Sequence, residues 1–118
     1  MKTLIRAASA LVLFTFACGG NDQADARDRA TTQTCNQYKS CGEIGPSQLF
    51  PNQDECLVQK RNFWDSTWLY AQCEGKIHSA AVDNCVNAIK AVSCANFSND
   101  YNSVVATQCS IAQVCNGR

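Results

Sequence analysis

Nine cysteines in a chain of 118 residues constrain this fold more than any other feature of the sequence. Eight of them are spread through the last 84 residues, a length at which a hydrophobic core alone gives only marginal stability. These eight are Cys35, Cys41, Cys56, Cys73, Cys85, Cys94, Cys109 and Cys115. An even set at this density is typical of exported domains stabilised by disulfides, so we predict four bridges.

The ninth cysteine, Cys18, follows a segment with the three-part pattern of an export signal. Lys2 and Arg6 supply its positive charge, and residues 7–17 form an uncharged stretch. That stretch has the length of a signal-peptide core and is shorter than the roughly 20 residues that cross a bilayer as a helix. We therefore predict a signal peptide over residues 1–17.

The junction before Cys18, which two glycines follow, resembles the start of bacterial lipoproteins, in which this cysteine is acylated. A lipobox usually has leucine and a small residue where this chain has Thr15 and Phe16. The resemblance covers residues 1–20 and implies a lipid anchor at Cys18, on the outer membrane, in the periplasm or at the cell surface. Two alternatives stay open: ordinary cleavage at the same bond, and a later cut after Ala26 that would remove Cys18 and release a secreted protein.

The segment after the anchor is predicted to be a flexible tether over residues 18–34. From residue 19 onward it contains no apolar side chain larger than alanine, so it cannot bury enough surface to offset the cost of ordering. Sixteen flexible residues would reach roughly 20–24 Å on average. Such a tether would lift the domain at residues 35–118 clear of the lipid headgroups.

The domain is predicted to be all-α, a small disulfide-stapled bundle of three main helices plus one short N-terminal helix. Apolar side chains recur at helical spacing, and strand patterns are poor. The main helices are expected over residues 53–73, 79–92 and 99–115, and the short one over 32–41. Asn52 and Ser98 are the expected N-caps of the first and third main helices. Residues 42–51 should form a loop that can fold Leu49 and Phe50 onto the bundle.

Antiparallel hairpins between consecutive main helices would bring three pairs of cysteines level. The resulting hypothesis is Cys56–Cys94, Cys85–Cys109 and Cys73–Cys115, with Cys35–Cys41 left by elimination. A regular helix would hold Cys35 and Cys41 about 9 Å apart, too far for a bridge. Either that segment is not a regular helix, or these two cysteines pair elsewhere.

Several kinds of chemistry lack support in the sequence. No C-x-x-C and no Cys/His pair at zinc-finger spacing occurs, so we predict no metal and no cofactor. His78 is the single histidine, no Gly-x-Ser-x-Gly accompanies it, and we expect it to cap a helix or face solvent rather than catalyse. From residue 35 onward six Lys/Arg and seven Asp/Glu are interspersed, which argues against nucleic-acid binding.

Trp64 and Trp68, with Phe63 and Tyr70, form the main aromatic cluster. Their helical spacing favours a core position, and the alternative is a binding surface, since tryptophan and tyrosine are frequent in binding hot spots. The eight-cysteine domain lacks the adjacent cysteine pair of plant lipid-transfer proteins and the six-cysteine set of saposin-like domains.

These features together lead to an expectation about function. We expect an exported, lipid-anchored, cysteine-rich protein of the bacterial cell envelope with a non-enzymatic binding or structural role. Its partners would be the membrane, through the lipid anchor, and an unidentified envelope protein. The alternatives are a carrier of a small apolar ligand in a cavity beside Trp64 and Trp68, and a secreted inhibitor or effector.

Overall fold

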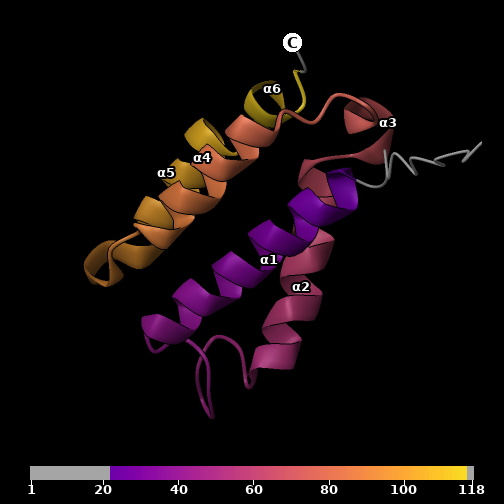
Figure 1. Ribbon diagram of the computed structural model, residues 1–118. Helices are drawn as coiled ribbons and strands as arrows, with labels where there is room; N and C mark the ends of the chain where they lie inside the picture. Colours follow the sequence, from indigo (N-terminus) through magenta and orange to yellow (C-terminus); the bar gives the residue numbers. More distant parts are fainter. Residues whose placement is uncertain (1–21, 117–118) are drawn as a thin grey trace, which may run out of the picture.

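The computed structural model describes residues 22–116, which form helices joined by short loops (Figure 1). The elements are α1 (Asp22–Ser40), α2 (Gln53–Thr67), α3 (Tyr70–Cys73), α4 (Ser79–Lys90), the 3-10 helix η1 (Cys94–Asn96), α5 (Phe97–Gln108) and α6 (Ile111–Val114). The predicted all-α, disulfide-stapled class is confirmed, and four of the helices are long. Within the described residues, none of these helices has the length and apolar character needed to cross a membrane.

The longest helix, α1, corrects the predicted tether. Residues 22–34 are helical rather than flexible, and α1 begins ten residues before the short helix expected over 32–41. Most of its buried side chains before Cys35 are small and fully or almost fully buried: Ala26, Ala30, Thr31 and Thr34. Residues 18–21 of the predicted tether, Cys18 and the predicted signal peptide lie outside the described residues.

The position of α1 in the bundle explains why its buried residues are small. It lies between α2 on one side and α4 on the other, and α4 in turn packs against α5 (Figure 1). A helix packed on two sides buries most of its circumference, and small side chains let both neighbours approach closely. The lack of large apolar residues in this segment therefore reflects close packing rather than solvent exposure.

Two predicted long helices are each interrupted. The helix expected over 53–73 ends at Thr67 and restarts as α3, and the helix expected over 99–115 ends at Gln108 and restarts as α6. Each interruption frees a backbone carbonyl, and each carbonyl accepts a hydrogen bond from a distant side chain. Gln23 Nε2 donates to the carbonyl of Trp68, and Trp68 Nε1 donates to the carbonyl of Cys109. Tertiary hydrogen bonds thus compensate for the helical bonds lost at both breaks.

One of the two predicted caps is confirmed. The Asn52 side chain accepts a hydrogen bond from the backbone N–H of Glu55 at 2.9 Å and begins α2. Ser98 is not a cap, because α5 already begins at Phe97, directly after η1. The hairpin turn expected between the second and third main helices is present, and η1 forms it.

The loop between α1 and α2 folds one of its two predicted residues inward. Phe50 is buried with 4% exposure, whereas Leu49 is 63% exposed. Gly42 ends α1 with a φ of +76°, a left-handed conformation that glycine adopts at little cost. Backbone hydrogen bonds between Glu43 and Phe50, and between Gly45 and Phe50, then close the loop onto the bundle.

Candidate functional site

Four disulfides join the helices, and two of the predicted pairs are confirmed. The observed bridges are Cys35–Cys56, Cys41–Cys94, Cys73–Cys115 and Cys85–Cys109. The predicted pairs Cys56–Cys94 and Cys35–Cys41 are wrong. Because α1 lies between α2 and α4, it separates Cys56 from Cys94. Cys35 within α1 meets Cys56 of α2, and Cys41, directly after α1, meets Cys94 of η1. Its regular helical geometry through Ser40 also keeps Cys35 away from Cys41.

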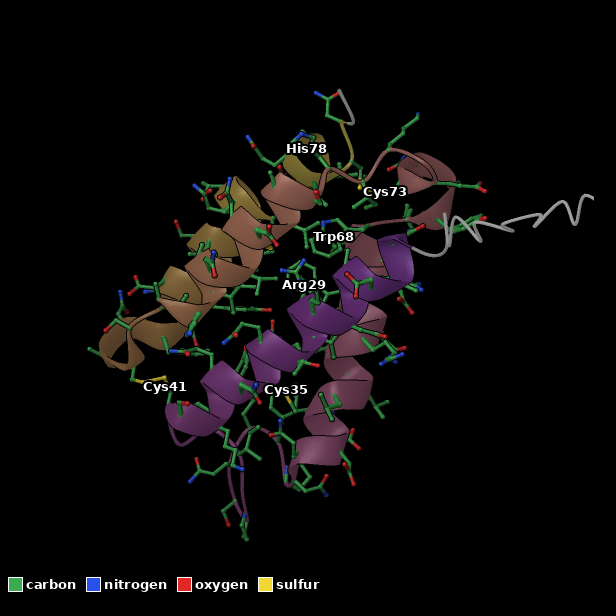
Figure 2. The ribbon with its side chains drawn as sticks, in the orientation of Figure 1. Arg29, Cys35, Cys41, Trp68, Cys73 and His78 are labelled. Carbon is green, nitrogen blue, oxygen red and sulfur yellow. A yellow bond between two sulfur atoms is a disulfide. The ribbon has the colours of Figure 1, made fainter. Side chains whose placement is uncertain are left out.

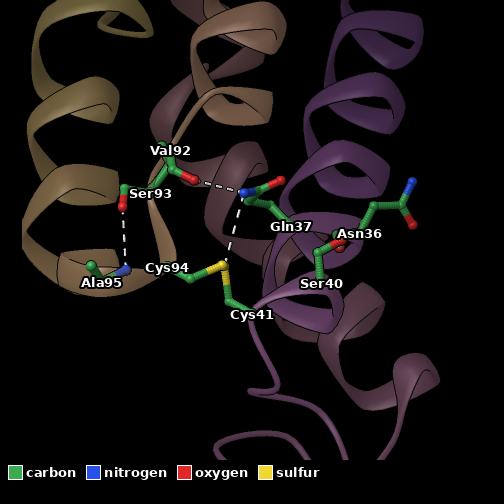
Figure 3. Close-up of a disulfide and its surroundings, with 8 residues drawn as sticks. All are labelled: Asn36, Gln37, Ser40, Cys41, Val92, Ser93, Cys94 and Ala95. Carbon is green, nitrogen blue, oxygen red and sulfur yellow. Dashed lines mark hydrogen bonds between the residues drawn. A yellow bond between two sulfur atoms is a disulfide. The ribbon is translucent and has the colours of Figure 1, made fainter.

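The four bridges differ in their access to solvent. Both cysteines of the other three bridges are at most 5% exposed, whereas Cys41 is partly exposed and Cys94 is exposed. The Cys41–Cys94 bridge ties the end of α1 to η1 (Figure 3). Beside it, Gln37 Nε2 donates to the carbonyl of Val92 at 2.7 Å and lies 3.9 Å from the Cys41 sulfur. This end of the bundle is therefore joined by a solvent-accessible bridge and a hydrogen bond, beside the packing of Tyr38 against Phe97.

Trp64 and Trp68 are fully buried, which confirms the core position that their helical spacing favours. The alternative, a binding surface at these two residues, is wrong. Their ring centroids lie 4.6 Å apart, and the Trp68 indole is fixed by its 2.8 Å hydrogen bond to the carbonyl of Cys109. Figure 2 shows Trp68 within the bundle. The exposed aromatic residues of this part of the chain are instead Phe63 and Tyr70, at 36% and 61%.

The most unusual electrostatic feature is an aromatic box around the ammonium group of Lys60. Four rings from α1, the α1–α2 loop, α2 and α5 surround this group. The Lys60 Nζ lies 4.8 Å from the ring centroid of Tyr38, 4.9 Å from Tyr101, 5.3 Å from Phe63 and 5.9 Å from Phe50. Cation–π attraction on this scale contributes roughly 0.5–2 kcal/mol per favourable contact. The box, defined by Lys60 and these four rings, lies where side chains of α1, α2, α5 and the α1–α2 loop meet.

No carboxylate within the described residues forms an ion pair with Lys60. Partial burial lowers the pKa of Lys60, because desolvation disfavours the charged amine. Burial raises the pKa of Tyr38 and of Tyr101, so neither phenol ionises at neutral pH to balance the lysine. Lys60 therefore contacts four ring faces and has no ion-pair partner among the described residues.

The arginines of α1 and α2 behave differently, because each of them has a carboxylate partner. The three ion pairs are Arg27–Asp65 at 2.7 Å, Arg29–Asp83 at 2.5 Å and Arg61–Asp28 at 2.8 Å. Two of them link α1 to α2, and Arg29 projects from α1 toward α4 to make the other (Figure 2). Exposed ion pairs of this kind contribute about 0–1 kcal/mol each, so their main effect is on helix register.

A cavity of about 250 Å³ lies between α1 and the start of α4. Its lining consists of Asp25, Ala26, Arg29, Ile77, Ser79 and Val82. Two charged side chains and a hydroxyl make this wall mixed rather than apolar. The cavity therefore differs in both place and chemistry from the apolar one expected beside the tryptophans.

His78 is confirmed as a helix cap. Its Nδ1 accepts a hydrogen bond from the backbone N–H of Ala81 at 3.3 Å, and α4 begins at the next residue. Among residues 22–116, no group of three or more histidine, cysteine, aspartate or glutamate side chains is placed to hold a metal ion.

The Lys60 box was missed by the sequence reasoning, although a pattern for it was present. Lys60 lies four residues after Cys56 and four before Trp64, both of which are fully buried. A lysine on the buried stripe of a helix needs a partner, and the aromatic residues elsewhere in the chain were the candidates.

Comparison with known proteins assigns a family but no activity. No curated protein and no solved structure matches the chain. A family described as a family of unknown function (DUF6184) matches residues 35–117, a range that contains all eight bridged cysteines. Because this match covers most of the sequence, the chain belongs to the DUF6184 family.

Proposed function

We propose that this is an exported protein of the bacterial cell envelope, anchored by a lipid on Cys18, with a non-enzymatic role in binding a partner. The observation that carries the proposal is the set of four disulfides in so short a chain. Such bridges persist in oxidising compartments and are rare in the reducing cytosol. The leader-like segment and its resemblance to lipoprotein starts support the anchor.

The binding role is favoured over an apolar-ligand carrier by the interior and the surface of the bundle. Trp64 and Trp68 pack against each other without exposure, and the cavity beside α4 has charged walls. At the surface, Phe63 is partly exposed beside the unpaired ammonium of Lys60. An exposed aromatic ring next to an uncompensated charge supports recognition of a protein segment that carries a carboxylate.

Export and anchoring are tested on the full-length chain by labelling cells with a radioactive fatty acid and fractionating them. We expect the label on the native protein in the membrane fraction, with all eight domain cysteines oxidised. A Cys18→Ser variant should lose the label, whereas a control lacking both Cys41 and Cys94 should keep it. A native protein that stays in the cytosol with thiols open to maleimide would overturn the proposal.

Partner binding is tested by placing a photo-crosslinking phenylalanine analogue at position 63. Val58 is the matched control, because it is 58% exposed on the same helix and faces another direction. We expect a protein adduct from position 63 and none from position 58, and a weaker adduct when Lys60→Met is added. Equal adducts from both positions would contradict a specific surface at the Lys60 box.

A further inference from the structure

The start of α1 sets how far the folded domain can lie from its anchor. α1 begins at Asp22, four residues after Cys18. Four residues span at most about 13–14 Å whatever their conformation. If Cys18 is acylated as proposed above, on which this inference rests, the first turn of α1 is held close to the membrane surface.

The same end of the bundle carries the α2–α3 corner. α2 runs back along α1, so the end of α2 lies beside the start of α1, where Gln23 Nε2 donates to the carbonyl of Trp68. Figure 1 shows α3 and the first turn of α1 at one end of the molecule and the α1–α2 loop at the other. The corner is therefore on the side of the domain that the anchor draws toward the lipid.

Two apolar side chains are exposed at this corner. Leu69 is 46% exposed and Tyr70 is 61% exposed, although Trp68 directly before them is fully buried. Leu69 has an extended backbone (φ −58°, ψ 133°), which turns the chain outward between α2 and α3. The Tyr70 hydroxyl donates to a Glu74 carboxylate oxygen at 2.7 Å, so the polar tip of the ring has a hydrogen-bond partner within the protein.

We propose that Leu69 and Tyr70 contact the lipid surface to which the protein is anchored. Leucine gains free energy from leaving water, and tyrosine favours the boundary between headgroups and acyl chains because its ring is apolar and its hydroxyl polar. Two such residues would bind a membrane weakly alone. The anchor makes the contact intramolecular, so even a weak interaction is occupied most of the time.

This contact would fix the orientation of the bundle. The α2–α3 corner would face the membrane, and the loop that carries Leu49 would face away from it, at the far end of α1 (Figure 1). The 19 residues of α1 span about 28 Å, so the far end lies beyond the headgroup region. The Cys41–Cys94 bridge and the exposed Leu49 are at that far end and would be presented to partners.

The test places a photo-crosslinking phenylalanine analogue at position 70 of the full-length protein in native membranes. Leu49 is the control position, because its 63% exposure matches the 61% of Tyr70 and it lies at the opposite end. After irradiation, phospholipid adducts are measured by mass spectrometry. We expect the adduct yield at position 70 to exceed that at position 49 by about ten-fold or more.

Fatty-acid labelling of the same preparation tests the lipid anchor separately from the membrane contact. A labelled protein with equal or absent adducts at positions 70 and 49 would overturn the membrane contact and leave the anchor standing. A native protein without label would overturn both. In a Cys18→Ser variant, the adduct at position 70 should fall to the level of position 49, and an unchanged adduct would show that the anchor does not set the orientation.

Discussion

Replacing Trp68 by phenylalanine should destabilise the domain more than the same replacement at Trp64, although both side chains are fully buried. The two indoles differ in their hydrogen bonding. Trp68 Nε1 donates to the carbonyl of Cys109 at 2.8 Å. Trp64 Nε1 is buried and has no partner among the described residues. The two substitutions therefore remove similar volumes and the same N–H donor, but the donor is paired at Trp68 and unpaired at Trp64.

The difference in stability follows from these polar groups, because the loss of packing volume is common to both variants. Trp68→Phe leaves the buried carbonyl of Cys109 without a donor, which costs about 1–3 kcal/mol. Trp64→Phe removes a buried donor that is already unpaired and recovers a comparable desolvation penalty. We expect the Trp68 variant to be less stable than the Trp64 variant by about 2–4 kcal/mol.

Guanidinium unfolding of the oxidised proteins measures this difference. Each variant keeps one tryptophan, so near-UV circular dichroism follows tertiary packing while far-UV circular dichroism follows helix content. Both probes should give the same midpoint if unfolding is two-state. Equal free energies of unfolding, or a less stable Trp64 variant, would contradict the hydrogen-bonding argument.

Three further predictions concern the bridges, the lysine and a cap. A dithiol added to the native protein should reduce Cys41–Cys94 before the buried bridges, as measured by differential alkylation, and earlier reduction of a buried bridge would contradict this. Replacing both cysteines by serine should lower the free energy of unfolding by about 4 kcal/mol, for a separation of 53 residues. Burial lowers the pKa of Lys60, so the native state holds this proton less tightly than the unfolded chain. The native protein should therefore gain stability relative to Lys60→Met as the pH rises toward 10.5, as measured by denaturant titrations at several pH values. A difference in unfolding free energy between the two proteins that does not change with pH would count against the desolvated amine. Asn52→Ala should lower the free energy of unfolding by about 1 kcal/mol, seen as a lower thermal midpoint, whereas an unchanged midpoint would argue against the cap.

Local patterns predicted part of the fold well. The period of apolar residues predicted α4, and Asn52 predicted the start of α2, because capping and amphipathicity depend on residues within one or two turns. The bridges Cys73–Cys115 and Cys85–Cys109 followed from the chain path after α2. By contrast, the period of apolar residues continued across the breaks after Thr67 and Gln108, so it did not predict them.

The candidate site was less predictable than the fold. Lys60 looked like an ordinary charged residue of a helix, because the rings that surround it come from four segments distant in sequence. Helical spacing favoured a core position for the tryptophans, but their frequency in binding hot spots left a binding surface open as the alternative. Both are buried because α1, predicted to begin only at residue 32, adds a full-length helix to the bundle.

Composition and spacing by themselves determined that the chain would be helical and would depend on disulfides. Its apolar residues recur at helical spacing, and a domain this short builds only a small core that eight cysteines can reinforce. Only the tertiary structure decided which cysteines meet. A cysteine pairs with a cysteine of the segment that lies beside it. For Cys56 and Cys94 that segment is α1 and the residue that follows it, and the small buried residues of α1 resemble those of a flexible linker. Burial, pairing and exposure depend on neighbours in space, which a local pattern does not specify.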